Sequence, residues 1–334
     1  MDAVILVGGF GTRLRPLTLT APKQMLPVAG ATMLERVVAH LARHGVDRAI
    51  LALGYRPDVF TDAFPEGRIA GVEMVYAVEP EPLDTGGAIA FAADVGGVKD
   101  TFIAVNGDVL TDLDVTEQVA IHRSTGAEGT IALTPVDDPS RFGVVPIDAD
   151  GRVTMFIEKP PAAEAPSRWI NAGCYVLEPS VLERIEPGRK VSIEREVFPA
   201  MVADGTLYAI EREGRWVDAG TPEAYLDAAL AYTDGRAASE RPVAADARVH
   251  ATARIERSWI GSGAVVGAGA LVLDSVLMDG AWVGEGATVR RSILGPRAFV
   301  GAGATLDAHT VVGEGAQVQA GAALSDARVP PETE

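Results

Sequence analysis

Over the first 235 residues, short apolar runs alternate with stretches in which apolar residues recur at helical spacing. The first run covers residues 3–7, and residues 33–44 carry Leu34, Val37 and Leu41 on one helical face. Further strands are expected at 49–53, 72–76, 102–105, 130–133 and 153–157, and helices after Gly86 and around 116–124. This alternation predicts an α/β fold with a doubly wound, mainly parallel, Rossmann-like sheet.

The pattern changes after residue 235, where Gly, Ala and Val dominate and a branched apolar residue recurs every five or six positions. A longer repeat is superimposed, because Ser258, Ser275 and Ser292 begin units that are 17 residues apart. Three short strands per coil at this spacing build a parallel β-helix, whereas a Gly/Ala-rich linker has no reason to keep a register. We therefore expect two domains, at 1–235 and 236–334.

Composition limits the possible partners. The 334 residues carry a formal charge of −17, which disfavours an extended nucleic-acid partner. The single cysteine, Cys174, excludes an intramolecular disulfide and is expected to be a small buried hydrophobe. No apolar run approaches the roughly 20 residues of a membrane span, and no signal peptide is visible. These features predict a cytoplasmic protein without a membrane partner.

A glycine-rich turn at residues 8–11 follows the first expected strand, and Arg13, Arg15 and Lys23 follow the turn. Such a turn exposes backbone N–H groups that cradle phosphates, and the three cations suit a polyphosphate. The spacing fits neither a P-loop nor a dinucleotide fingerprint. An ordinary strand-to-loop turn is the alternative, but the added cations favour phosphate chemistry.

Seven motifs in one order extend this interpretation. They are Gly8–Thr18, Pro22–Lys23, Asn106–Val109, Phe142–Val145, Glu158–Pro160, Asn171–Gly173 and Trp216–Pro222. With these motifs, residues 1 to about 232 resemble the sugar-1-phosphate nucleotidyltransferase family, specifically its mannose-1-phosphate guanylyltransferase type. The C-terminal repeats resemble the hexapeptide repeats of a left-handed β-helix, which occur in the same family.

In this family an oxygen of a sugar 1-phosphate attacks the α-phosphorus of a nucleoside triphosphate and expels pyrophosphate. Both substrates are polyanions, so the site must cancel charge and hold them in line. The resemblance makes Arg13 and Lys23 the catalytic cations and Asp108 and Asp218 the ligands of Mg²⁺, which prefers carboxylates and substrate phosphates.

The resemblance also implies two binding sets. The expected nucleotide-binding residues are Leu6, Gly8, Gly9, Gly11, Thr12, Arg13, Glu81, Thr85, Gly86, Asn106 and Gly107. The expected sugar-phosphate-binding residues are Gly143, Glu158, Lys159, Asn171 and Glu194. Within loop 79–88, Glu81 is an acceptor candidate for the base. The consecutive glycines Gly86 and Gly87 are expected to give backbone groups access to the base or the phosphates.

The favoured reaction joins GTP and mannose 1-phosphate into GDP-mannose. Asp84 and Gln24 stand where the guanylyl type usually has Gly and Pro, which leaves open a thymidylyltransferase for glucose 1-phosphate or an enzyme for a modified sugar or cyclitol phosphate.

Two hypotheses of another class are a non-catalytic regulatory subunit that senses an NDP-sugar, and a β-helix acyltransferase based on His250 or His309. We expect a homo-oligomer assembled through the β-helix, and some remaining chemistry when residues 236–334 are removed.

Overall fold

The computed structural model describes residues 1–54, 56–233 and 242–331, so the expected boundary at 235–236 lies outside the described residues. Two compact units are formed. The first, which we name the sheet unit, combines Met1–Gly9 with Leu34–Trp216. The second, the solenoid unit, combines Phe10–Met33 with Val217–Glu334. The two compact units therefore differ from the expected domains 1–235 and 236–334, because segment 10–33 belongs to the same unit as the β-helix.

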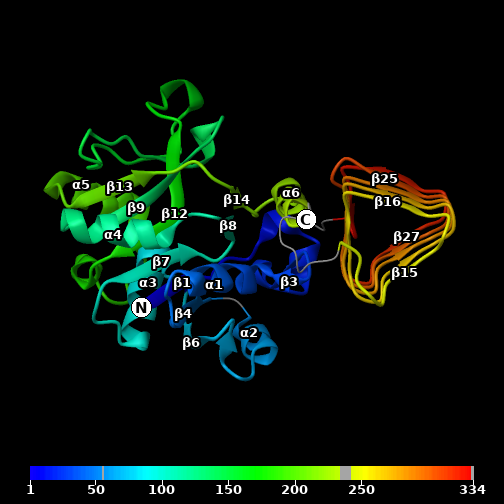
Figure 1. Ribbon diagram of the computed structural model, residues 1–334, viewed down its shortest axis with the longest axis horizontal. Helices are drawn as coiled ribbons and strands as arrows, with labels where there is room; N and C mark the ends of the chain where they lie inside the picture. The colour runs from blue at the N-terminus through cyan, green and yellow to red at the C-terminus, as the bar shows by residue number, and fades with distance from the viewer. Residues whose placement is uncertain (55, 234–241, 332–334) are drawn as a thin grey trace. The chain divides into compact units, whose positions relative to one another are not determined.

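The sheet unit is built on a ten-stranded mixed sheet (Figure 1). Eight strands follow the order β11-β10-β12-β7-β1-β4-β6-β5, and off this path β9 pairs with β12 and β13 pairs with β9. Parallel pairs join β1 to β4 and β7, and β4 to β6, whereas β12 runs antiparallel to β7 and β9. The strands are β1 (Asp2–Leu6), β4 (Arg48–Leu53), β5 (Arg68–Ile69), β6 (Val72–Val78), β7 (Phe102–Asn106), β9 (Gly129–Pro135), β10 (Gly143–Val144), β11 (Ile157–Glu158), β12 (Trp169–Leu177) and β13 (Leu207–Glu211).

The prediction of an α/β sheet is confirmed, but the strand expected at 153–157 is wrong over most of its length. Within this run, all of whose residues are described, only Ile157 and the following Glu158 form a strand, and Val153 makes an isolated bridge to Ile147. Met155 is 51% exposed. Val153 is buried, but the run as a whole thus lacks the two-sided burial that a central strand provides.

Six α-helices are described, and those expected at 33–44, after Gly86 and around 116–124 are confirmed. They are α1 (Met33–Arg43), α2 (Pro57–Ala63), α3 (Asp84–Gly96), α4 (Val115–Thr125), α5 (Phe198–Asp204) and α6 (Pro222–Ala231). Asp114 caps α4 by accepting from Glu117 N, and Gly126 ends it in the left-handed region at φ 62°. No helix in the described part of the chain has both the length and the apolarity that a membrane crossing requires.

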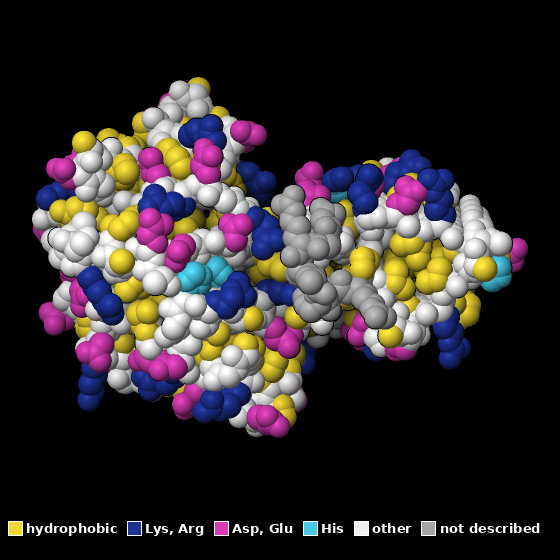
Figure 2. Space-filling model, viewed as in Figure 1, with side chains coloured by type: hydrophobic (Ala, Val, Ile, Leu, Met, Phe, Trp, Pro, Cys, Tyr) yellow, Lys and Arg dark blue, Asp and Glu magenta, His cyan; other side chains and the backbone are white. Residues whose placement is uncertain are grey.

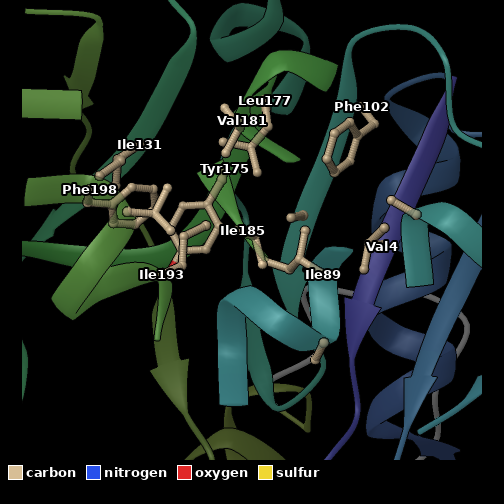
Figure 3. Packing of buried hydrophobic residues seen from close by; sticks show 14 of the residues in the cluster. Val4, Ile89, Phe102, Ile131, Tyr175, Leu177, Val181, Ile185, Ile193 and Phe198 are labelled. Atoms are coloured by element: carbon tan, nitrogen blue, oxygen red, sulfur yellow. The ribbon is translucent and has the colours of Figure 1, made fainter. Parts of the chain in front are cut away.

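Aliphatic side chains and a few aromatic ones fill the core of the sheet unit (Figure 3). Phe102, Tyr175 and Phe198 are fully buried, and the rings of Tyr175 and Phe198 meet edge to face with centroids 5.1 Å apart. Each buried side chain of this size stabilises the fold by about 2–3 kcal/mol. The packing holds β12 and α5 together and thereby fixes the strand ends from which the candidate site residues project.

The solenoid unit contains a parallel β-helix of three five-stranded sheets, which Figure 1 shows nearly end on as a triangle. Register confirms the 17-residue coil, since Val249 pairs with Val266 and Val266 with Val283. One later coil is a residue longer and pairs Val300 with Val318. Parallel stacking of this kind is consistent with the left-handed β-helix that the resemblance implies.

The strands of the β-helix are short. The first sheet has β15 (Arg248–Val249), β18 (Val265–Val266), β21 (Trp282–Val283), β24 (Phe299–Val300) and β27 (Gln317–Val318). The second has β16 (Arg254–Glu256), β19 (Leu271–Leu273), β22 (Thr288–Arg290), β25 (Thr305–Asp307) and β28 (Ala323–Ser325). The third has β17 (Trp259–Ile260), β20 (Val276–Leu277), β23 (Ile293–Leu294), β26 (Val311–Val312) and β29 (Arg328–Val329).

The repeated serines form a buried ladder at one corner of the coils. Ser275 N donates to Ser258 Oγ at 3.0 Å, and Ser292 N donates to Ser275 Oγ at 3.2 Å. Elsewhere the chain has the hairpin β2 (Pro27–Val28) and β3 (Ala31–Thr32), together with β8 (Val109–Thr111) and β14 (Trp216–Asp218).

Candidate active site

Three predicted nucleotide-binding residues meet at the carboxyl ends of β1 and β7. Leu6 pairs with Asn106 across the two parallel strands, and Gly107 N donates to Leu6 O at 2.9 Å. A Cβ atom at Gly107 would lie 2.9 Å from that carbonyl oxygen, so the close approach requires glycine. Asp108 follows directly, at the edge of the sheet where doubly wound folds bind ligands.

The glycines after β1 leave open space. Gly8 and Gly9 are exposed, and no described atom lies within 4 Å of the position that a Cβ would take on either. Gly9 has φ +101°, a conformation that glycine adopts without strain. A bulky anion can therefore approach this backbone closely, as the phosphate interpretation of the turn requires.

The solenoid unit contains both predicted catalytic cations and one predicted metal ligand. A Cβ atom at Gly220 would lie 2.8 Å from Arg13 Nη2 and 2.9 Å from Asp218 Oδ1, so these two side chains converge over Gly220. Thr18 Oγ1 donates to Gly11 O at 2.7 Å, and a Cβ at Gly11 would lie 3.3 Å from Lys23 Cβ. The exposed Thr12 begins the short 3-10 turn Thr12–Leu14 that carries Arg13.

Hydrogen bonds within loop 79–88 and to Val191 fix the conformation of this loop. Glu79 Oε2 accepts from Leu83 N at 2.9 Å, and burial raises the pKa of the Glu79 carboxyl, while Glu81 is exposed. The amides of Gly86 and Gly87 both donate to Val191 O, at 2.8 and 3.1 Å. The expectation that these two amides reach a base or a phosphate is therefore wrong, because close packing of α3 against this carbonyl occupies them.

The two departures from the guanylyl pattern lie in different surroundings. Asp84 adopts φ +61°, a conformation that suits Gly and that Asp tolerates, and its Oδ1 accepts from Thr85 N at 2.9 Å. Gln24 is 1% exposed inside the turn Lys23–Met25, and its Oε1 accepts no hydrogen bond from the described residues. The Asp84 carboxylate thus accepts a backbone hydrogen bond at the start of α3, and this local role accounts for the residue without reference to the base.

Thr85 and Glu194 are brought together from distant parts of the chain. Thr85 Oγ1 donates to Glu194 Oε2 at 2.6 Å and accepts from Ile193 N at 3.0 Å. Ser192 Oγ, which the sequence did not single out, also donates to Glu194 Oε2, at 2.8 Å. Glu194 lies in the π-helical turn Ile193–Val197, and two hydroxyl groups fix its carboxylate.

The predicted sugar-phosphate residues Gly143, Glu158 and Lys159 form one cluster. Gly143 pairs with Glu158 across β10 and β11, and a Cβ at Gly143 would lie 3.1 Å from Glu158 Oε2. Lys159 Nζ lies 3.1 Å from Glu158 Oε1 and its side chain is 57% exposed. An exposed ammonium group beside a carboxylate suits a phosphorylated sugar, which offers both an anion and hydroxyl groups.

Asn171 lies at an irregularity of β12, where the register with β9 shifts between Asn171 and Tyr175. Its Nδ2 donates to Tyr175 Oη at 2.8 Å, and its Oδ1 accepts from Gly173 N at 2.9 Å. Trp216 Nε1 donates to the neighbouring Ala172 O at 2.9 Å. Tyr175 and Trp216 are supporting residues that sequence reasoning missed, since an aromatic residue in an apolar run carries no distinct signal.

Comparisons with known proteins bear on this geometry. Residues 2–235 match the family model described as nucleotidyl transferase, and residues 239–334 match the model of the GMPPB C-terminal domain. The chain belongs to the nucleotidyl transferase family. It is 42% identical to the mannose-1-phosphate guanylyltransferase of Mycobacterium tuberculosis over 84% of this chain and 80% of that protein. It is 44% identical to the mannose-1-phosphate guanyltransferase of Schizosaccharomyces pombe, over 70% of this chain and 64% of that protein.

A solved structure supports the same grouping. HddC from Yersinia pseudotuberculosis complexed with GMP-PN superimposes with a TM-score of 0.59 at 33% identity, over 69% of this chain and 99% of that chain. The resemblance to nucleotidyltransferases inferred from the seven motifs is thereby confirmed.

Two side chains outside these clusters have structural partners in this nucleotidyltransferase. Cys174 is buried, and burial raises the pKa of its thiol to about 12, so it is no nucleophile near neutral pH. His309 Nε2 faces the Arg291 guanidinium at 3.0 Å, which engages the nitrogen that an acyltransferase would need as a base.

Proposed function

We propose that the chain is a mannose-1-phosphate guanylyltransferase, which transfers GMP from GTP to mannose 1-phosphate and releases pyrophosphate. The observation that carries this proposal is the convergence of Arg13 and Asp218 over Gly220, in a chain 42% identical to a mannose-1-phosphate guanylyltransferase. A guanidinium beside a carboxylate suits a triphosphate that is bound together with a divalent cation.

In the proposed reaction a phosphate oxygen of mannose 1-phosphate attacks the α-phosphorus of GTP. A new P–O bond forms there, and the bond to the β-phosphate oxygen breaks with its electron pair leaving on pyrophosphate. Arg13 and Lys23 neutralise the charge on the departing group, while Lys159 holds the attacking phosphate. The open backbone at Gly8 and Gly9 admits the triphosphate.

We further propose that the enzyme uses Mg²⁺ held by Asp108 and Asp218. No cluster of three or more potential metal-ligating side chains occurs among the described residues. Two carboxylates fit this ion, which proteins bind through one or two carboxylates plus substrate phosphates. The bound ion would supply charge neutralisation on the phosphates, in addition to the two cationic side chains.

Guanine is the base we propose. The relatives' names and the GMP-PN complex of HddC support it, and Asp84 does not oppose it, because its backbone conformation accounts for the departure from Gly. Glu81, exposed in loop 79–88, remains the predicted acceptor for guanine N–H groups.

Assembly into a homo-oligomer through the β-helix is part of the proposal. One outward row of the first sheet is in register and carries no acidic residue, and it consists of Arg248, Val265, Trp282, Phe299 and Gln317. Trp282 and Phe299 are 45% and 39% exposed, and their rings stack with centroids 6.4 Å apart. Two chains that each carry a charge of −17 meet most readily on such a row.

One triangular end of the described β-helix adds apolar surface. Hydrophobic side chains gather in the middle of the triangular end that faces the viewer in Figure 2. Such ends favour contact with another chain. Sedimentation of a Trp282→Ser/Phe299→Ser variant tests the row: a smaller species is expected, and an unchanged species contradicts this part of the proposal.

A matrix of four nucleoside triphosphates against mannose, glucose and modified sugar 1-phosphates tests the activity. Pyrophosphate release and product mass are measured with Mg²⁺, with Arg13→Ala as the background control. GDP-mannose from GTP and mannose 1-phosphate is the expected product. Preferred turnover of TTP with glucose 1-phosphate contradicts the base and the sugar, and no turnover with any pair favours the regulatory subunit.

A further inference from the structure

One outward row of the β-helix is buried although it points away from the solenoid core. The core holds the second residue of each pair in the third sheet, namely Ile260, Leu277, Leu294 and Val312. The first residues therefore point outward, yet Trp259 is only 9% exposed, and Val276, Ile293 and Val311 are 0% exposed. The corresponding row of the first sheet exposes Trp282 by 45%. The two tryptophans thus mark a covered and an uncovered face of one solenoid.

Segment 10–33 and α6, which belong to the same compact unit, contact the covered side. A Cβ atom at Gly30 would lie 3.0 Å from Trp259 Cζ2, so the indole rests on this glycine. At the other end of the segment, a Cβ at Gly313 would lie 3.0 Å from Pro16 Cβ.

Helix α6 makes further contacts on this side. It packs against β20, and its Asp227 carboxylate lies 3.6 Å from the Arg291 guanidinium. Tyr225 Oη in the same helix donates to Pro27 O. Helix α6 therefore links the β-helix to the segment through both an ion pair and a hydrogen bond.

The two contacts of segment 10–33 lie close in sequence to its predicted catalytic cations. Pro16 is three residues after Arg13, and Gly30 is seven residues after Lys23. Within the segment the structure has three short 3-10 turns, the two-stranded hairpin of β2 and β3, and the first residue of α1, so its conformation depends on what it packs against. The outward apolar row of the β-helix supplies that support.

We propose that the β-helix positions the triphosphate-binding segment, with Trp259 and Gly313 as positioning residues that act through Gly30 and Pro16. The expected loss of turnover rests on the proposed function, whereas the support of segment 10–33 by the β-helix rests on packing alone. A displacement of about 1 Å in a catalytic group costs on the order of 10²-fold in rate. Loosening the row should therefore reduce turnover without removing any group that touches substrate.

The kinetic test compares Trp259→Ala with Trp282→Ala in the full-length chain. We expect Trp259→Ala to lower kcat/KM for GTP by roughly 10-fold to 100-fold, with the KM for mannose 1-phosphate within twofold of wild type. The matched Trp282→Ala, from the uncovered face, should leave both constants unchanged even if it alters assembly. Trp259→Phe should restore most of the loss. Equal constants for the two alanine variants would overturn the inference.

A second readout needs no substrate. Hydrogen exchange of residues 10–33 should accelerate in Trp259→Ala and in Gly313→Ala, whose added methyl group presses on Pro16, but not in Trp282→Ala. Unchanged exchange in folded Trp259→Ala overturns the inference and leaves the proposed function intact. If wild type turns over no substrate pair, the proposed function fails, and the exchange result still decides whether the β-helix supports the segment. If the Trp259→Ala chain does not fold, hydrogen exchange of residues 10–33 in Gly313→Ala tests the inference instead.

Discussion

The sheet unit and the solenoid unit hold their candidate site residues by different means. In the sheet unit, polar partners fix the side chains, as in the 2.6 Å bond from Thr85 to Glu194 and the 3.1 Å ion pair of Lys159 with Glu158. In the solenoid unit, the segment that carries Arg13 rests on apolar packing against the β-helix. Substitutions can therefore perturb the two substrates separately. Changes to the ion pair of Lys159 with Glu158 should affect the sugar phosphate, and changes to the packing of segment 10–33 should affect the triphosphate.

Loss of the Arg13 guanidinium should have the largest effect. Arg13→Ala removes a cation that neutralises charge developing on pyrophosphate, and we expect kcat/KM to fall by at least about 10³-fold. Steady-state pyrophosphate release measures the change. Arg123→Ala, on the exposed side of α4, is the matched control and should stay within twofold. A loss of similar size in the control would show that general charge, and not this group, is responsible.

A cavity in the solenoid core should have the next largest effect. Leu294 is fully buried in the β-helix, so Leu294→Ala should lower the free energy of unfolding of this unit by about 2–5 kcal/mol. Chemical denaturation followed by tryptophan fluorescence measures the loss. The control Val265→Ala, in the outward row, should cost less than about 1 kcal/mol. If Leu294→Ala also accelerates hydrogen exchange in segment 10–33, this supports the positioning role of the β-helix. Turnover that stays unchanged at the denaturant concentration where the β-helix is half unfolded would contradict that role.

A substitution at the predicted sugar-phosphate site should change the KM for mannose 1-phosphate alone. Lys159→Ala removes a charge-assisted contact to the sugar phosphate, so the KM for mannose 1-phosphate should rise by about 10-fold to 100-fold. The KM for GTP should remain within twofold. Lys99→Ala, an exposed lysine elsewhere in the sheet unit, is the control. An equal rise in both KM values would contradict the separation of the two substrate sites.

Acid should weaken the sheet unit through His40. Burial, followed by the nearby His44 and Arg43 charges, lowers the pKa of His40 from 6.5 to about 4. Between these values the unfolded chain binds a proton that the folded chain does not, so stability is present above pH 6.5 and is lost as the pH falls towards 4. We expect His40→Gln to remove on the order of 1–2 kcal/mol of this loss, measured by denaturation at pH 5 and 7.5. An unaltered pH dependence in the variant would contradict the assignment.

Much of the fold could be predicted from periodicity. Buried parallel strands such as β4 and β7 are continuous apolar runs, and the 17-residue register of the β-helix is directly visible. The run at 153–157 misled because an apolar sequence without a burying neighbour, as at Met155, looks the same as a strand. Burial comes from tertiary partners, which local pattern does not specify.

The grouping of the site residues was less predictable. Motif order assigned segment 10–33 to the sheet, whereas the structure joins it to the β-helix. Adjacent apolar residues gave no decisive signal. They occur in the covered strands, as in Val276–Leu277, and equally in the uncovered ones, as in Trp282–Val283. Tertiary partners decide which outward row is covered. The bonds of Gly86 and Gly87 to Val191 likewise had no local signal, since they join segments about 100 residues apart.

Native-state hydrogen exchange of the wild-type chain in increasing denaturant tests most directly whether segment 10–33 belongs with the β-helix. Residues that unfold as one cooperative unit converge on one opening free energy. We expect residues 10–33 to converge with coils 248–318, although β1 and α1 flank the segment in the sequence. Convergence of 10–33 with β1 and α1, apart from the β-helix, would contradict it.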